Sequence, residues 1–178
     1  MHRLFVAIRP PPLVRRQLLA LMQGVKGARW QDDDQLHVTL RFIGEVDGAQ
    51  ADDVAAALGA VATQRFSVAV SGVGSFGSRG RINALWAGVR AAESLAHLHR
   101  KIDHALVRAG LEPERRAYLP HITLARFGRE SGGVDTFLAD HAALSSPPFE
   151  VTEFALFESY LSQHGSSYAE VEQYQLRG

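Results

Sequence analysis

Two stretches of this sequence are almost the same peptide. HVTLRFIG begins at His37 and HITLARFG begins at His121, and without a gap they share histidine, threonine, leucine and glycine at the same four positions. The chain has eight histidines among 178 residues, so chance is a poor explanation for two such copies. We therefore expect two related halves whose repeated peptides act together.

Each copy has the alternating pattern of a β-strand. Successive side chains of a strand point to opposite faces, so we expect His37, Thr39 and Arg41 on one face and Val38, Leu40 and Phe42 on the other. The second copy repeats this pattern with His121 and Thr123. The polar faces are thus free to line a site, while the apolar faces join the core.

The rest of the chain predicts an α+β fold in which both halves follow a similar order of strands and helices. We expect helices over residues 10–25, 51–62 and 95–109, and a short helix after the second copy. We expect further strands over residues 4–8, 65–73, 82–89, 149–162 and 166–176, the last two as a hairpin. Asp47 and Gln50 have the spacing of a capping box at the start of the second helix.

This order predicts two pseudo-symmetric lobes, with antiparallel or mixed sheets, flanking helices and an active-site cleft between the lobes. The Gly/Ser-rich stretch 71–80 is of loop length, and no low-complexity segment separates the halves. We therefore expect a single domain over residues 1–178.

Composition narrows the function classes. Nineteen basic and nineteen acidic residues leave no net field to hold a long polyanion, so any nucleic-acid contact should be local, at ends or single nucleotides. The absence of cysteine excludes disulfides and thiolate metal sites. No apolar run approaches the roughly 18 residues of a membrane span, so we expect a cytoplasmic protein without membrane attachment.

The paired motif suits chemistry at phosphorus. Two facing imidazoles, His37 and His121, can hold one neutral and one protonated member, as general acid–base displacement requires. The hydroxyls of Thr39 and Thr123 could hydrogen-bond the non-bridging oxygens of a phosphoryl group between them. This chemistry needs no metal or other cofactor.

Over almost its whole length the chain resembles the two-histidine phosphoesterase superfamily, specifically the RNA 2′,3′-cyclic phosphodiesterases, also called LigT-like proteins or 2′-5′ RNA ligases. The resemblance rests on LHVTLRFIG and YLPHITLARF, with support from RLFVAI, LWAGV and LFESYLSQHGSSYAEVEQYQL. It implies hydrolysis of an RNA 2′,3′-cyclic phosphate to a 2′-phosphomonoester, with His37 as proton donor and His121 as proton acceptor. It also implies the reverse reaction, which joins RNA ends through a 2′-5′ linkage. We expect a monomer without an obligate protein partner.

Five further side chains are candidates for substrate contacts. Strand alternation places Arg41 on the face of His37, whereas Arg126 has the wrong parity and needs a bulge or strand end to reach the site, although the family pattern favours it. Arg79 and Arg81, in the predicted glycine-rich loop, could meet RNA beyond the cyclic end. Tyr118 could stack on a base.

Several other features favour structural roles. GVGSFG, from residue 72, precedes a predicted strand and not the helix that a dinucleotide site needs, and the aspartates at 32–34 are expected to be solvated. We expect His97, His99 and His104 on the surface, because their spacing lacks the i, i+4 pair of a helical zinc site. We expect core positions for Phe5, Trp30 and Trp86.

Two alternative functions remain open. In a metal-dependent phosphoesterase, His37 and His121 would be ligands, although no further ligands are evident at matching parity. In an RNA-end binding module, the same pocket would bind without turnover.

Overall fold

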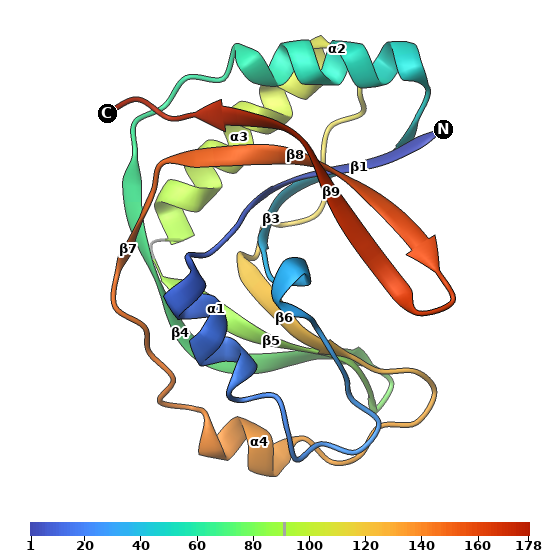
Figure 1. The fold of residues 1–178 in the computed structure, drawn as a ribbon, viewed down its shortest axis with the longest axis vertical. Coiled ribbons are helices and arrows are strands. Elements are labelled where there is room, and N and C mark those ends of the chain that lie inside the picture. The colour runs from blue at the N-terminus through green and yellow to red at the C-terminus, as the bar shows by residue number, and fades with distance from the viewer. Residues whose placement is uncertain (91) are drawn as a thin grey trace.

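The two repeated peptides lie on neighbouring strands at the centre of one curled sheet (Figure 1). The computed structural model describes residues 1–90 and 92–178, which form nine strands, four α-helices and one short 3-10 helix. The strands are β1 (His2–Ile8), β2 (Arg29–Trp30), β3 (Val38–Val46), β4 (Phe66–Ser78), β5 (Arg81–Arg90), β6 (His121–Arg126), β7 (Phe149–Val151), β8 (Glu153–Ser162) and β9 (Gly165–Gln175). Their order is β7-β4-β5-β6-β3-β1-β8-β9, with β2 paired to β6 outside this path.

The seam between β3 and β6 divides the sheet into two lobes. The first lobe contains β3, β1, β8 and β9, and the second contains β6, β5, β4 and β7. All the pairings between these strands are antiparallel. The predicted α+β fold with two pseudo-symmetric lobes is confirmed, but the lobes share one continuous sheet because β3 and β6 pair directly.

The helices are α1 (Pro12–Leu19), the 3-10 helix η1 (Asp33–Gln35), α2 (Gly48–Gly59), α3 (Ala92–Arg108) and α4 (Asp135–Asp140). α3 packs against β3 and α2, and α1 and α4 lie beside the second lobe (Figure 1). α1 is shorter than predicted because the chain tightens into short-range turns after Leu19. The predicted capping box is confirmed: the Asp47 side chain accepts from the Gln50 backbone N–H at 2.8 Å.

The Gly/Ser-rich stretch is strand and not loop, which corrects a prediction. β4 continues through residue 78, and only Arg79 and Gly80 form the turn before β5. One of its glycines is required by packing, since a Cβ at Gly74 would lie 2.3 Å from the ring of Trp86. β5 follows this turn, so the GxGxxG pattern leads into a strand and not into a helix N-terminus.

The aliphatic side chains of both repeated peptides are buried in the core, as predicted; these are Val38, Leu40, Ile122 and Leu124. Phe5 is also buried, as predicted, whereas Trp30 and Trp86 are only partly buried. No helix in the described part of the chain is both long and apolar enough to cross a membrane.

Candidate active site

The repeated peptides run antiparallel and pair through the aliphatic residue at the second position of each copy. Continuing that register by one residue sets His37 opposite Thr123 and Thr39 opposite His121, on one face of the sheet. All four side chains are half-buried, while the aliphatic residues between them are buried. Each histidine is therefore next to the threonine of the other copy.

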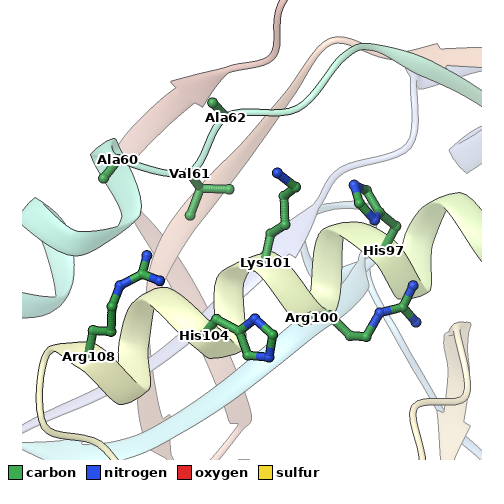
Figure 2. Close-up of a pocket in the computed structure, with 8 residues that line it drawn as sticks. All are labelled: Ala60, Val61, Ala62, His97, Arg100, Lys101, His104 and Arg108. Carbon is green, nitrogen blue, oxygen red and sulfur yellow. The ribbon is translucent and has the colours of Figure 1, made fainter.

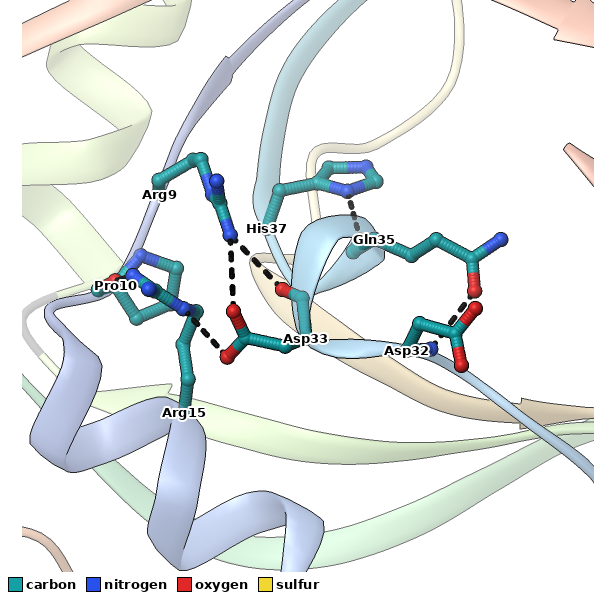
Figure 3. A network of polar contacts seen from close by, with 7 residues as sticks. All are labelled: Arg9, Pro10, Arg15, Asp32, Asp33, Gln35 and His37. Atoms are coloured by element: carbon teal, nitrogen blue, oxygen red, sulfur yellow. Dashed lines mark hydrogen bonds and ion pairs between the residues drawn. The ribbon is translucent and has the colours of Figure 1, made fainter. Parts of the chain in front are cut away.

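The two histidines are held in the same way. His37 Nδ1 donates to the Gln35 carbonyl at 2.6 Å (Figure 3), and His121 Nδ1 donates to the Leu119 carbonyl at 2.7 Å. Because a carbonyl only accepts, Nδ1 carries the proton in each neutral ring, and Nε2 is the nitrogen left for a ligand. The copies thus repeat both the side chains and their orientation.

Both imidazoles favour the neutral form in the free protein. Burial, with smaller contributions from the charges of Arg126 and His121, lowers the pKa of His37 to about 4, against the opposite effect of the Gln35 hydrogen bond. Burial also lowers the pKa of His121, with a further contribution from Arg126. Arg126 therefore lies within electrostatic reach of both histidines.

Aromatic rings form much of the wall around each histidine. The ring centroid of Phe5 lies 5.0 Å from that of His37. For His121, Phe76 packs edge-on at 5.0 Å, and Trp86 lies at 6.2 Å. Among the described residues, no three His, Cys, Asp or Glu side chains are grouped as a metal site would require.

A β-bulge in each strand changes which side chains face the cleft. The pairing of β1 with β3 skips Leu40, and the pairing of β5 with β6 skips Leu124, so the extra residue is at the same position in both copies. After the bulge, each side chain points to the face opposite to the one that regular strand alternation predicts. Arg126 therefore returns to the cleft side, and Phe42 does so at the matching position of the first copy.

The same bulge turns Arg41 toward α3, which corrects the prediction that it shares the face of the histidines. Arg41 is only 7% exposed, and its Nε donates to Asp103 on α3 at 2.7 Å. Its other nitrogens donate to the carbonyls of Phe42 and Glu112. Burial alone would raise the pKa of Asp103, but hydrogen bonds from Arg41 and the Glu114 N–H hold it below its usual value. Arg41 thus ties β3 to α3, and it also lines the cavity that contains Thr39 and His121.

Tyr118 and His99 hold the backbone of β3 in place. His99 is 9% exposed and not on the surface as predicted, because its ring stacks on Tyr118 at 4.4 Å. His99 Nδ1 donates to the Leu40 carbonyl at 2.6 Å, and the Tyr118 hydroxyl donates to the Thr39 carbonyl at 2.8 Å. Burial raises the pKa of Tyr118, so its hydroxyl keeps its proton. Together the two rings fix the bulged part of β3.

Two adjoining cavities form the cleft. One, of about 410 Å³, is lined by Thr39 and His121, and the other, of about 430 Å³, by His37 and Arg126. Phe42 lines both cavities and is 59% exposed. The prediction that Phe42 packs on the apolar face with Val38 and Leu40 is wrong, because the bulge at Leu40 turns Phe42 to the cleft. The alignment of Phe42 with Arg126 in the two copies was a usable signal.

Asp32 and Asp34 are exposed, as predicted, whereas Asp33 is partly buried and pairs with two arginines. Asp33 accepts from Arg15 Nε at 2.9 Å and lies 3.9 Å from Arg9 (Figure 3). The hydrogen bond from Arg15 lowers the pKa of Asp33. The Asp32 N–H donates to the Gln35 side chain at 2.8 Å, which fixes η1 and the carbonyl that orients the first histidine.

The chain is similar to known proteins in sequence and in fold. A family model described as LigT like Phosphoesterase matches residues 8–86 and 89–168. A protein of Archaeoglobus fulgidus named RNA 2′,3′-cyclic phosphodiesterase is 28% identical over 172 residues, 95% of this chain and 97% of the relative. The crystal structure of TT0787 of Thermus thermophilus has a TM-score of 0.81 at 27% identity, covering 99% of this chain and 98% of the other. Escherichia coli LigT complexed with 3′-AMP has a TM-score of 0.78 at 25% identity, covering 99% of each chain.

Proposed function

Because the chain belongs to the LigT-like phosphoesterase family, we propose that it hydrolyses 2′,3′-cyclic phosphate ends of RNA to 2′-phosphomonoesters. The observation that carries this proposal is the pair of imidazoles, each with Nδ1 bound to a backbone carbonyl and Nε2 left for the substrate. The name of the Archaeoglobus relative supports the substrate class, and the 3′-AMP complex of Escherichia coli LigT supports a nucleotide-sized ligand.

The reaction is an in-line displacement at phosphorus between the two histidines. His121 Nε2 takes a proton from water, whose oxygen forms the new bond to phosphorus, while His37 Nε2 gives its proton to the departing 3′ oxygen. The bond between phosphorus and the 3′ oxygen breaks, and the phosphate stays on the 2′ oxygen. The assignment of donor and acceptor follows the family resemblance, because the local geometry of the two histidines is nearly the same.

The negative charge of the substrate explains how His37 can act as the acid although its pKa is low in the free protein. In the free protein, burial keeps this imidazole neutral at pH 7, yet the proposed acid must carry a proton. An anionic phosphodiester beside the ring favours the imidazolium and raises its pKa when substrate binds. An acid that is weakly basic in the free protein then gives up its proton readily in the transition state.

Four side chains complete the proposed binding site. The hydroxyls of Thr39 and Thr123 donate to the non-bridging oxygens, and Arg126 offsets their negative charge. The exposed ring of Phe42, which lines both cavities, offers a face on which the base can stack. Tyr118 is assigned to positioning β3, because its hydroxyl and one ring face are already engaged.

The same displacement accounts for 2′-5′ ligation. If a 5′ hydroxyl replaces water as the nucleophile, its oxygen forms the new bond to phosphorus and the 3′ oxygen leaves, which yields a 2′-5′ phosphodiester. Both histidines come from one chain, so the proposed functional unit is a monomer without a protein partner.

The test is to incubate a 2′,3′-cyclic mononucleotide with the protein in excess EDTA and identify the product. We expect the 2′-phosphomonoester at an unchanged rate, and a loss of roughly 10²–10⁴-fold in the His37→Ala and His121→Ala variants. Complete loss of activity in EDTA, with recovery on adding zinc or manganese, would establish the metal-dependent alternative. Binding of the nucleotide without turnover under every condition would establish the binding module.

A further inference from the structure

Outside the catalytic cleft, arginines gather where the β4–β5 turn meets the segment after β6. Arg79, Arg81 and Arg129 line a cavity of about 830 Å³ together with Asn83 and Gly128, and we call this surface the arginine groove. All three arginines are exposed, and none takes part in an ion pair among the described residues. No acidic residue lines this cavity. The groove is a local concentration of positive charge on a chain whose formal net charge is zero.

The arginine groove shares no lining residue with the cleft, but it begins at Phe127, one residue beyond Arg126, which lines the cleft. β6 begins at His121 and ends at Arg126, and the next residues along the chain reach the groove. Two hydrogen bonds join its walls: Phe127 N–H donates to the Asn83 carbonyl at 3.0 Å, and Arg81 Nη2 donates to the Arg129 carbonyl at 3.2 Å. Figure 1 shows the β4–β5 turn and the segment after β6 side by side.

The backbone conformation of Arg79 independently indicates a role for this arginine. Arg79 and Gly80 form a two-residue hairpin turn with φ of 53° and 76°, and Arg79 is the non-glycine residue with positive φ in the described chain. Such turns favour Asn-Gly, because other side chains cost about 1 kcal/mol in this conformation. An arginine at this position lowers the stability of the turn, so its presence points to a role for its side chain.

We propose that the arginine groove binds the backbone phosphates of the RNA nucleotides that precede the cyclic end, an inference that rests on the proposed function. A mononucleotide would fill only the cleft, whereas a longer RNA leaving the cleft past Arg126 would meet the groove next. Guanidinium groups bind phosphate oxygens with paired hydrogen bonds, without reading the base sequence. The preferred substrate is therefore an oligoribonucleotide with a 2′,3′-cyclic end.

A second basic surface of the chain provides a matched control. Five basic side chains of α3 line a cavity of about 340 Å³ beside residues 60–62 (Figure 2); they are His97, Arg100, Lys101, His104 and Arg108. All are exposed, which confirms the prediction for its two histidines. The lining residues of this cavity come from α3 and residues 60–62, and none of them lies on or next to β6, which carries His121 and Arg126, so the cavity does not continue the path of the substrate.

The experiment compares two triple variants that remove the same net charge from the full-length chain. One carries Arg79→Asn, Arg81→Gln and Arg129→Gln in the arginine groove, and the other carries Arg100→Gln, Lys101→Gln and Arg108→Gln on α3. Asn suits the turn better than Arg, so Arg79→Asn should not unfold the hairpin. Each protein is assayed with a 2′,3′-cyclic mononucleotide and with an oligoribonucleotide carrying the same cyclic end, over a range of salt concentrations.

We expect the groove variant to raise KM for the oligoribonucleotide by about 10-fold and to leave KM for the mononucleotide unchanged. The slope of log(kcat/KM) against log salt should fall by about 0.7 for each lost phosphate contact, or about 2 in total. The α3 variant should behave as the unmodified protein does. Equal effects of the two variants, or equal effects on the two substrates, would overturn the proposal.

A binding measurement separates this inference from the proposed function. Fluorescence anisotropy reports the affinity for the labelled oligoribonucleotide whether or not it is cleaved. If the unmodified protein turns over neither substrate, the proposed function fails. Weaker binding by the groove variant alone would still support the arginine groove, and unchanged binding would overturn it.

Discussion

At the scale of single residues, the two copies of the repeated peptide are nearly equivalent, yet the proposed reaction needs an acid on one side and a base on the other. Both histidines donate through Nδ1 to a carbonyl two residues earlier. The fifth residue after each histidine differs, since it is Phe42 in the first copy and Arg126 in the second. A base on the phenyl ring and a phosphate at the guanidinium would orient the substrate and so distinguish the two roles.

The roles of the histidines can be separated by a substrate with a better leaving group. A thiolate needs far less protonation than an alkoxide, so a 3′-thio cyclic substrate should replace the acid but not the base. We expect substantial rescue of His37→Ala and little rescue of His121→Ala, measured as kcat/KM relative to the oxygen substrate. The opposite pattern of rescue would exchange the two assignments.

At the scale of elements, the strands and the histidine pair could be predicted from the sequence, and the side chains beyond the bulges could not. Alternation places His37 and Thr39 correctly because they precede the extra residue, but it misplaces Arg41, which follows Leu40. A bulge inserts one residue without any residue type that marks it, so parity is lost from that point. The burial of His99 was not predicted for a different reason: helical spacing does not show that its ring packs on Tyr118.

The connection between β3 and α3 can be tested at Arg41. Removing the guanidinium in Arg41→Met leaves the half-buried Asp103 carboxylate without its partner, which should cost about 3 kcal/mol of unfolding free energy. Chemical denaturation measures this loss, and Arg41→Lys should retain part of the stability. At a temperature where the variant stays folded, KM should change little; a large increase in KM with normal stability would instead show that Arg41 contacts the substrate.

At the scale of the whole molecule, both members of the proposed catalytic pair lie at the seam between the lobes. β3 and β6 pair at one position, and from there the strands diverge to opposite halves of the sheet. Aromatic residues from both lobes enclose the seam, so its titratable groups are shielded from water. The stability of the molecule should therefore depend on the protonation of this region.

The pH dependence of unfolding tests this expectation. The pKa of His37 is about 4 in the folded protein and near 6.5 when unfolded, so the unfolded chain binds more protons between these values. Stability from this group is fully present above pH 6.5 and is lost as the pH falls toward 4, by up to about 3 kcal/mol. Denaturation curves of His37→Gln should show a shallower decline over this range. An identical pH profile in the variant would contradict the shift, because carboxylates that titrate in the same range remain in both proteins.

The strand order also determines when, during translation, the support around His37 can be completed. β1, made first, pairs with both β3 and β8, so the lobe of His37 stays open at one edge until residues 153–162 are made. Gln35, whose carbonyl orients His37, donates from its side chain to the Ser166 carbonyl on β9 at 2.6 Å. A nascent chain that has already completed both histidine motifs would thus lack one support of the first until the ribosome has finished the last hairpin.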